Sequence, residues 1–546
     1  MKHLASIITL LLVTNLILCQ DCPTQNIFIN SNAKLLEFIS DFPNCVEIST
    51  SLTISNTNDI ENLDLLQQIE SIHGGLSLTN NSELKTLSGF QNLRYSGGNV
   101  RIQSNPLLDT INQFQSLDTI KGSLTITTNS SLLDINDFHD LESVTSISIN
   151  NPILESINGF NLIDSLSQNL AIGFCDSLKN ISGFTNLEYC DFLDLTILGN
   201  LKSIDAFQNL KETGFFATRN CAIENWNNFG NLRKVENLTI QNCNNFINFE
   251  GLNNLNSISN HFNIDACASL FDLKGLDNLE VVENSLTIQS NQSLQSLEGL
   301  GSLNRVNDLF IENNSSLINL IGLTQLKVVE DRFDIEGNLN IENCIGLESI
   351  DSIGTELNTF GSDNRILICS NPSLSSLDGL ENLKFIGENL YVFDNETLKE
   401  ITGIQNTNIS NLSLVAMKRN PQLDFCSINN ICTFLETNSQ NAQFEDNGTK
   451  CNSISAINEE CETSSTSNPQ LTHFTIYPNP SSSEFHLNAN SYEIKKIEVY
   501  NSNFSKVIDQ INLTKGLIRF EVPTKGIYYL KIYSNDKISS YKLIKV

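Results

Sequence analysis

The chain has 546 residues, a length that allows several domains or one long repeat array. Hydrophobic residues make up 40% of it, which is enough for a folded core and argues against global disorder. The net charge of −30 is unevenly spread, because residues 474–546 hold ten basic and six acidic residues and the remainder therefore carries −34. Such an acidic body repels phosphates, which argues against nucleic acid as a partner and leaves open basic partners or solubility alone.

The chain opens with Lys2 and an apolar run from Leu4 to Leu18. This run is too short for a stable membrane span and predicts a secretory signal peptide over residues 1–20, cut between Cys19 and Asp21. A lipid-modified Cys19 is the alternative. No later stretch is apolar for long enough to span a membrane, so we expect no transmembrane segment and a secreted or outer-membrane cell-surface protein.

Export makes the cysteines of the mature chain interpretable as disulfide partners. One group flanks the start of the mature chain and another follows the last repeat, so we expect an N-terminal cap over residues 21–50 and a Cys-rich C-terminal cap over residues 426–461. The disulfide candidates are Cys22, Cys45, Cys426, Cys432, Cys451 and Cys461. Their pairing is open, and a zinc site is the alternative for the last four, although they lack a paired Cys-x2-Cys.

A unit of mostly 22–25 residues repeats along residues 51–425 and predicts about sixteen coils. It reads Leu-x-Ile-x-x-Asn-x-x-Leu, as in LTITTNSSL from Leu124, and continues to Gly-Phe/Leu-x-Asn-Leu, as in SGFQNL ending at Leu93. The alternation Leu-x-Ile places its apolar residues on one face of a short strand. No unit can bury this stripe alone, so the repeat predicts a mainly β solenoid of stacked coils.

The second apolar strand residue marks each predicted coil. These residues are Ile54, Leu78, Ile102, Ile126, Ile149, Ile172, Leu195, Ala217, Ile240, Ile264, Ile288, Ile311, Ile341, Ile368, Val392 and Met417. The step lengthens before Ile341 and Ile368, which predicts an irregular insertion around Glu330–Gly337 and a second at Ser352–Asn364.

The Asn three residues after the strand predicts a ladder of amides that bond neighbouring coils. Its expected members are Asn105, Asn129, Asn220, Asn291, Asn314, Asn371, Asn395 and Asn420. Cysteine takes this place at Cys175, Cys243, Cys267 and Cys344. A small buried thiol fits such a position, so we interpret these four cysteines as structural ladder residues and not as nucleophiles.

The repeat resembles the leucine-rich-repeat superfamily and, more narrowly, the receptor L domain, over about Cys22 to Cys461. The two-residue gap between the ladder Asn and the next Leu and the terminal cysteines carry the narrower resemblance. It implies a solenoid with a parallel β-sheet and a ligand-binding role. The chain departs from receptors of this kind because the array is unbroken and no cysteine-rich, transmembrane or kinase segment accompanies it.

The polar segment 462–473 predicts a linker, and residues 474–546 then change in character. Alternating β-branched and aromatic residues at Ile497–Tyr500, Ile518–Val522 and Tyr528–Tyr533 predict a small β-sandwich. One interpretation of these residues is an ordinary β-sandwich that binds a ligand.

Two motifs and the end of the chain resemble the type A C-terminal sorting domain of type IX secretion in Bacteroidetes. They are FTIYPNP from Phe474 and KGIYYLKI from Lys525, and the sorting-motif residues are Tyr477, Pro478, Asn479, Pro480, Gly526 and Tyr528. The resemblance implies contact with the type IX machinery and export through the outer membrane.

No catalytic pattern is visible: the histidines are widely spaced, and no metalloprotease, Gly-x-Ser-x-Gly or phosphate-loop motif occurs. We therefore expect no enzyme, no cofactor and no metal site. The predicted function is protein or glycan binding or adhesion. A structural cell-envelope component without a soluble ligand is the alternative, and a secreted hydrolase the remote one.

The natural binding surface is the open face of the predicted sheet. Its side chains are expected to include Thr53, Thr79, Arg101, Gln103, Thr125, Thr127, Asp194, Phe216, Thr239, Gln241, Asp265, Gln289, Phe310, Glu312, Tyr391, Phe393 and Lys418. Exposed aromatic rings beside charges are enriched in recognition surfaces, so Phe310, Glu312, Tyr391 and Phe393 are the candidate ligand-binding residues. In the alternative, the insertion before Ile341 packs on these rings.

Overall fold

The computed structural model describes residues 22–354, 363–466, 475–477, 485–488, 494–501, 505–511, 517–534 and 538–545. The chain divides into two compact units, Met1–Cys461 and Glu462–Val546. The predicted signal peptide lies outside the described residues. The first unit is a solenoid of parallel strands, and the second contains two small antiparallel sheets.

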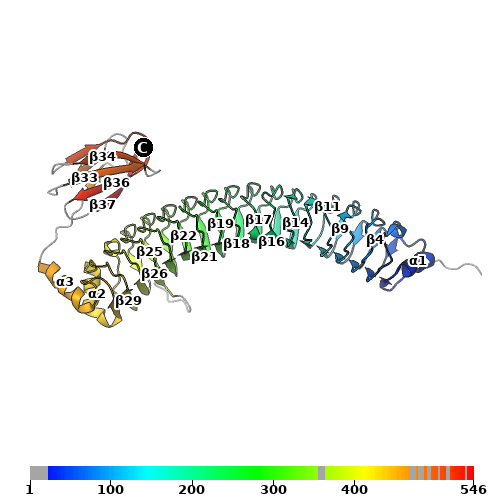
Figure 1. Cartoon of the computed structure of the whole chain (residues 1–546), viewed down its shortest axis with the longest axis horizontal. Helices are drawn as coiled ribbons and strands as arrows, with labels where there is room; N and C mark the ends of the chain where they lie inside the picture. The colour runs from blue at the N-terminus through cyan, green and yellow to red at the C-terminus, as the bar shows by residue number, and fades with distance from the viewer. Residues whose placement is uncertain are drawn as a thin grey trace, which may run out of the picture. The chain divides into compact units, whose positions relative to one another are not determined.

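About 17 turns stack side by side into an arc, with one long parallel sheet along its concave side (Figure 1). The long strands of this sheet are β1 (Ile27–Ile29), β3 (Leu52–Ser55), β5 (Leu76–Thr79), β7 (Val100–Gln103), β10 (Ser123–Thr127), β12 (Ser146–Asn150), β14 (Ser165–Gly173), β16 (Tyr189–Leu198), β17 (Glu212–Cys221), β18 (Lys234–Gln241), β20 (Phe262–Asp265), β21 (Val281–Gln289), β22 (Arg305–Glu312), β24 (Phe333–Glu336), β26 (Arg365–Cys369), β28 (Asn389–Phe393), β29 (Leu414–Lys418) and β30 (Ala442–Glu445).

Short strands run beside the long ones in many coils. They are β2 (Glu47–Ile48), β4 (Ser71–Ile72), β6 (Tyr95–Ser96), β8 (Thr110–Ile111), β9 (Thr119–Ile120), β11 (Asp134–Asp137), β13 (Ser156–Gly159), β15 (Asn180–Ile181), β19 (Ser257–Ile258), β23 (Val328–Val329), β25 (Ser352–Ile353) and β27 (Phe385–Ile386). Two coils contain a single turn of 3₁₀ helix, η1 (Asp64–Leu66) and η2 (Thr402–Ile404). The fold is therefore mainly β, as the repeat predicts.

Neighbouring coils stack in register, so equivalent residues lie directly above one another. Leu76 pairs with Val100 and Leu78 with Ile102, and all four are buried. Each buried Leu or Ile contributes about 1.5–3 kcal/mol, which only stacking with the next coil makes available.

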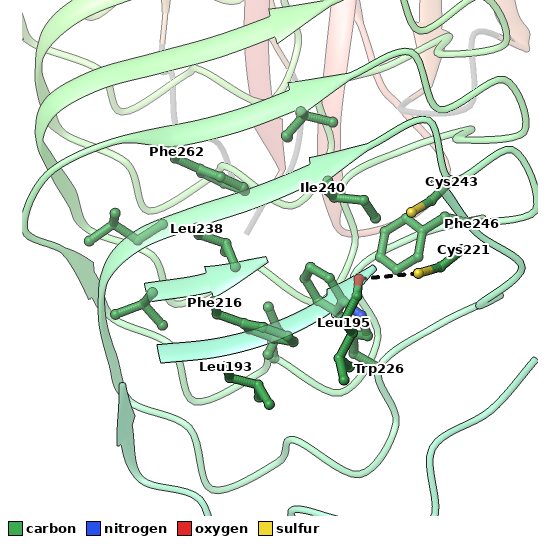
Figure 2. Packing of buried hydrophobic residues seen from close by; sticks show 14 of the residues in the cluster. Leu193, Leu195, Phe216, Cys221, Trp226, Leu238, Ile240, Cys243, Phe246 and Phe262 are labelled. Carbon is green, nitrogen blue, oxygen red and sulfur yellow. Dashed lines mark hydrogen bonds between the residues drawn. The ribbon is translucent and has the colours of Figure 1, made fainter. Parts of the chain in front are cut away.

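A column of phenylalanine rings fills the interior of the first half of the array. Ring centroids of successive coils lie 4.9–5.8 Å apart in the series Phe90, Phe114, Phe138, Phe160, Phe184, Phe207 and Phe229. The column continues into a denser aromatic cluster around Trp226, where Phe216 and Phe246 face the same interior (Figure 2). Gly89, which precedes the first ring, has φ +115°, and a Cβ there would lie 1.9 Å from the Leu63 carbonyl oxygen, so this position requires glycine.

An asparagine ladder runs through most coils. The backbone N–H of Asn105 donates to Oδ1 of Asn129 at 3.0 Å, and its side-chain amide donates to the Leu78 carbonyl at 3.0 Å. The same pattern occurs at Asn81, Asn105, Asn129, Asn291, Asn314, Asn338, Asn371, Asn395 and Asn420. These bonds satisfy backbone groups that the turn would otherwise leave unpaired in the core.

Two predicted ladder members are wrong. Asn220 is exposed with φ 53°, and the buried Cys221 beside it takes the ladder place, with its thiol 3.2 Å from the Leu195 carbonyl (Figure 2). Cys344 lies outside the ladder, which passes through Asn338 instead. Cys175 and Cys243 do occupy ladder places, and their thiols approach backbone carbonyls of the preceding coil.

The strand prediction fails in the same two coils. The inward residue of β17 is Thr218, which pairs with Leu195, and the predicted surface residue Phe216 is fully buried. The inward residue of β24 is Ile335 and not Ile341. No insertion therefore lies at Glu330–Gly337. The extra length falls between β24 and β26, around the expected Ser352–Asn364, of which residues 355–362 lie outside the described residues.

Helices and disulfides close both ends of the array. Helix α1 (Asn32–Asp41) buries Leu35 and Phe38 on the first coil, and Ser31 caps it by accepting from the Lys34 N–H at 3.3 Å. Helices α2 (Asn429–Asn438) and α3 (Ile454–Thr466), with a 3₁₀ turn η3 (Ser439–Asn441), follow the last coils. Because α3 continues through Thr466, the first five residues of the predicted linker are helical.

The structure joins all six candidate cysteines in disulfides. The pairs are Cys22–Cys45, Cys426–Cys451 and Cys432–Cys461. None of the last four is left as a thiolate, so the zinc alternative is excluded for them.

The second unit has its own hydrophobic core, which includes Phe485, Leu530 and Ile532. One sheet contains β31 (Thr475–Tyr477), β32 (Phe485–Asn488) and β35 (Leu517–Phe520), and the other contains β33 (Ile494–Asn501), β34 (Lys506–Ile511), β36 (Gly526–Ser534) and β37 (Ile538–Lys545).

Candidate ligand-binding face

The four predicted binding residues lie on the outer face of the long sheet. Phe310 and Glu312 alternate with buried residues of β22, and Tyr391 and Phe393 alternate with buried residues of β28. All four are partly exposed. Alternation along a half-buried strand therefore places their side chains on the side away from the core.

The four residues form two pairs and not one cluster. The register runs from Phe310 to Asp334, then to Leu367, then to Tyr391. Phe310 and Tyr391 are thus three strands apart, about 14 Å at the usual strand spacing. We call the outer side of β22, β24, β26 and β28 the C-terminal face.

Phe310 lies beneath a fixed guanidinium. The Cζ atom of Arg332 is 4.9 Å from the Phe310 ring centroid, within cation–π distance. Asp308 holds this arginine with two hydrogen bonds, of 3.1 Å to Nε and 2.8 Å to Nη2, and these bonds raise the pKa of Arg332. What covers Phe310 is therefore an arginine of the next coil, which offers both charge and planar surface to a partner.

A second bidentate ion pair lies between the Phe310/Glu312 pair and the Tyr391/Phe393 pair. Arg365 donates to Oδ1 of Asp334 at 3.1 Å and to Oδ2 at 2.6 Å, and the Asp334 side chain is 4% exposed. Such a paired geometry is rigid, so the centre of the C-terminal face is preorganised.

The Tyr391 and Phe393 rings contact each other with centroids 5.6 Å apart. Arg419, held by Asp394 through two bonds of 2.6 Å, lies 5.9 Å from the Phe393 centroid. Burial, followed by the charge of Asp363, raises the pKa of Tyr391, so its phenol stays a hydrogen-bond donor near neutral pH.

Glu312 lies in register with Glu336 on the adjacent strand. Burial, followed by the charges of Glu336 and Asp334, raises the pKa of Glu312. Within the described part of the chain, the carboxylates of Glu312 and Glu336 form no ion pair. This side of the C-terminal face therefore presents uncompensated negative charge.

Several residues of this face escaped the sequence analysis. Asp334 and Glu336 were missed because the coil was anchored on Ile341, six residues too late. Arg332 directly precedes β24 and Arg365 is the first residue of β26, and only the spatial pairing with Asp308 and Asp334 shows their role. A search for Asp and Arg at equivalent positions of successive coils could have found them.

In the second unit, one buried carboxylate organises a sheet. Glu498 accepts hydrogen bonds from Lys496, Lys506, Tyr500 and Tyr533. Burial alone would raise its pKa, but these four donors outweigh that effect and lower it.

The predicted sorting-motif residues fall in three places. Tyr477 ends β31 and Gly526 begins β36. The hydroxyl of Tyr528 donates to the Thr524 carbonyl at 2.9 Å. Pro478, Asn479 and Pro480 lie outside the described residues.

Residues 475–546 match the model of the secretion system C-terminal sorting domain. The chain ends in a sorting domain. This sorting domain marks proteins of type IX secretion, so the protein is exported and is released or attached at the cell surface. Among the described residues, no helix is long and apolar enough to cross a membrane, and no group of three His, Cys, Asp or Glu side chains is placed to hold a metal ion.

Residues 44–109, ahead of the sorting domain, match the model of the receptor L domain. Both matched families are of non-enzymatic kinds. No curated protein matches the chain. Among solved structures, a leucine-rich repeat protein from Bacteroides ovatus ATCC 8483 is 15% identical, covers 64% of this chain and 87% of its own, and has a TM-score of 0.18.

Proposed function

We propose that this exported solenoid is a non-enzymatic cell-surface binding protein that holds a protein or glycan ligand on its C-terminal face. The observation that carries the proposal is the Tyr391–Phe393 ring pair, which lies partly exposed on a rigid sheet beside ion-paired arginines. Tyrosine, phenylalanine and arginine are among the residues enriched where proteins recognise partners.

The scaffold supports this proposal physically. In-register strands and bidentate Asp–Arg pairs hold the surface in place before a ligand arrives, so binding orders few additional side chains. Such preorganisation lowers the entropy lost on association and leaves more of the contact free energy as affinity.

The test is a pull-down and glycan-array screen with the full exported chain, followed by titration of the ligand found. The variant Phe310→Ala/Tyr391→Ala/Phe393→Ala should weaken binding at least about tenfold, since central aromatic residues dominate such interfaces. The matched control is Phe174→Ala/Phe271→Ala/Phe425→Ala, which removes three exposed phenylalanines outside the C-terminal face.

If the two triple variants bind the ligand with equal affinity, the C-terminal face is not the binding site. Self-association of the chain with no ligand in either screen would favour a structural role in the cell envelope instead.

A further inference from the structure

The N-terminal part of the sheet presents a second surface of different chemistry. We define the neutral face as the outer side of β3, β5, β7, β10, β12 and β14. Its side chains are mainly hydroxyls and amides, including Thr53, Thr79, Gln103, Thr125, Ser148 and Asn150. Arg101 is the one charged residue of this face. The neutral face has no carboxylate, although residues 1–473 as a whole carry a net charge of −34.

Six polar side chains of the neutral face are not used by the protein. Within the described residues, the side chains of Thr53, Thr79, Gln103, Thr125 and Ser148 make no hydrogen bond, and neither does that of Asn150, yet all are partly exposed. They repeat at one strand spacing, about 4.8 Å. On the C-terminal face, by contrast, Asp308 and Asp334 are held in ion pairs with Arg332 and Arg365.

An exposed aromatic ring borders this surface. Phe192 of β16 is 43% exposed, and the ring of Phe215 lies 5.3 Å away on its β17 side. Its partner in register on the other side is Asn169 of β14, followed by the small Ala171. Phe192 therefore forms a wall at the edge of the neutral face.

These features select one class of occupant. A stable protein interface buries about 800 Å² per partner around an apolar core. The neutral face has no such core, but only single exposed rings at its two ends, Phe28 of β1 beside Thr53 and Phe192 of β16. A charged polymer finds no matching row of charges. A linear sugar polymer supplies hydroxyls that both donate and accept, a C–H face that stacks on an electron-rich ring, and a repeat close to one strand spacing.

We infer that the neutral face binds a neutral, β-linked linear polysaccharide across its strands, with one sugar ring stacked on Phe192. The site is independent of the C-terminal face and goes beyond the function proposed above. The hydroxyls and amides of successive strands bond successive sugar units, so affinity accumulates over several weak contacts.

Native affinity electrophoresis of the full exported chain tests the inference, with hydroxyethyl cellulose, galactomannan or alginate in the gel. At least one of the two neutral polymers should slow the protein, and the anionic alginate should not. Phe192→Ala should raise the Kd about tenfold, and Gln103→Ala several-fold.

The matched controls are Phe271→Ala, an exposed phenylalanine between β20 and β21, and Gln289→Ala, an outer-face glutamine of β21. Both should bind as the unaltered chain does, and so should the Phe310/Tyr391/Phe393 triple variant, which separates this site from the C-terminal face. No retardation by either neutral polymer, retardation by alginate, or unchanged binding of Phe192→Ala would overturn the inference.

Discussion

The side-chain oxygen of Asn338 accepts two hydrogen bonds from Asn314 in the preceding coil, one from the backbone N–H at 3.0 Å and one from the side-chain amide at 3.4 Å. The amide of Asn338 in turn donates to the Ile311 carbonyl at 2.8 Å. Asn338 is fully buried, so water cannot replace these bonds.

We therefore expect Asn338→Ala to lower the free energy of unfolding by about 3 kcal/mol. The variant leaves the Asn314 N–H and the Ile311 carbonyl unpaired in the core, and each such group costs about 1–3 kcal/mol. Urea unfolding followed by circular dichroism measures the change. The control is Asn340→Ala, an exposed residue of the same turn, which should stay within about 0.5 kcal/mol. Equal losses in the two variants would refute the ladder's contribution.

The general fold could be predicted because its signal recurs in every coil. A single Leu-x-Ile-x-x-Asn unit is ambiguous, but stacking demands that equivalent residues align, and the repeat supplies that alignment many times over. The prediction failed where a coil breaks the pattern. In β17 a polar Thr218 points inward and the bulky Phe216 compensates for it, which a search for aliphatic residues misreads.

The candidate site could be predicted only in part, for the same reason. Phe310 and Tyr391 lie on regular strands, so their alternation placed them on the outer face. Arg332 and Arg365 act through pairing with acids of neighbouring coils, and single-strand periodicity carries no information about such contacts between coils.

The C-terminal disulfides should stabilise the last coils. Cys426–Cys451 and Cys432–Cys461 close loops of 25 and 29 residues, and a crosslink of this length contributes about 3 kcal/mol by restricting the unfolded chain. We expect Cys432→Ala/Cys461→Ala to release α3 and expose the last coils to limited proteolysis. Mass spectrometry of the fragments locates the first cut.

The control variant is Cys22→Ala/Cys45→Ala, which opens the other end of the array. It should move early cleavage to the N-terminal coils and leave the C-terminal pattern unchanged, because repeat arrays transmit stability mainly between neighbours. A C-terminal cut that is equally fast in both variants would count against local capping.

Cys369 should be the most reactive free thiol and should report on occupancy of the C-terminal face. It is half-buried in register with Glu336 and Phe393, whereas Cys190 is fully buried with its pKa raised to about 12. Burial raises the pKa of Cys369 above its ordinary value of 9.0. Only the thiolate reacts, so its alkylation rate should rise about tenfold per pH unit through pH 9 without levelling off.

Iodoacetamide labelling followed by peptide mass spectrometry measures these rates. A ligand on the C-terminal face should slow the labelling of Cys369. A plateau below pH 9, or equally fast labelling of Cys190, would show that the thiol is in a different environment.

Export should depend on the folded sorting domain. We expect deletion of residues 475–546 to leave the solenoid inside the cell, since this segment matches the C-terminal sorting domain that marks proteins of type IX secretion. Glu498→Gln should reduce surface display, because the neutral side chain loses the ion pairs that the Glu498 carboxylate forms with Lys496 and Lys506. Glu521→Gln alters an exposed carboxylate paired with Lys545 and should not reduce display.

Surface proteolysis of intact cells, compared with immunoblots of the periplasm, distinguishes these outcomes. The lowered pKa of Glu498 also determines how the stability of the sorting domain depends on pH. The ionised Glu498 side chain contributes stability above its ordinary pKa of 4.5, and this contribution is lost as the pH falls through the lower pKa of the folded state. The sorting domain should therefore lose stability at acid pH, and Glu498→Gln should remove that part of the pH dependence. Normal display of the deletion variant would instead place the export signal within the solenoid.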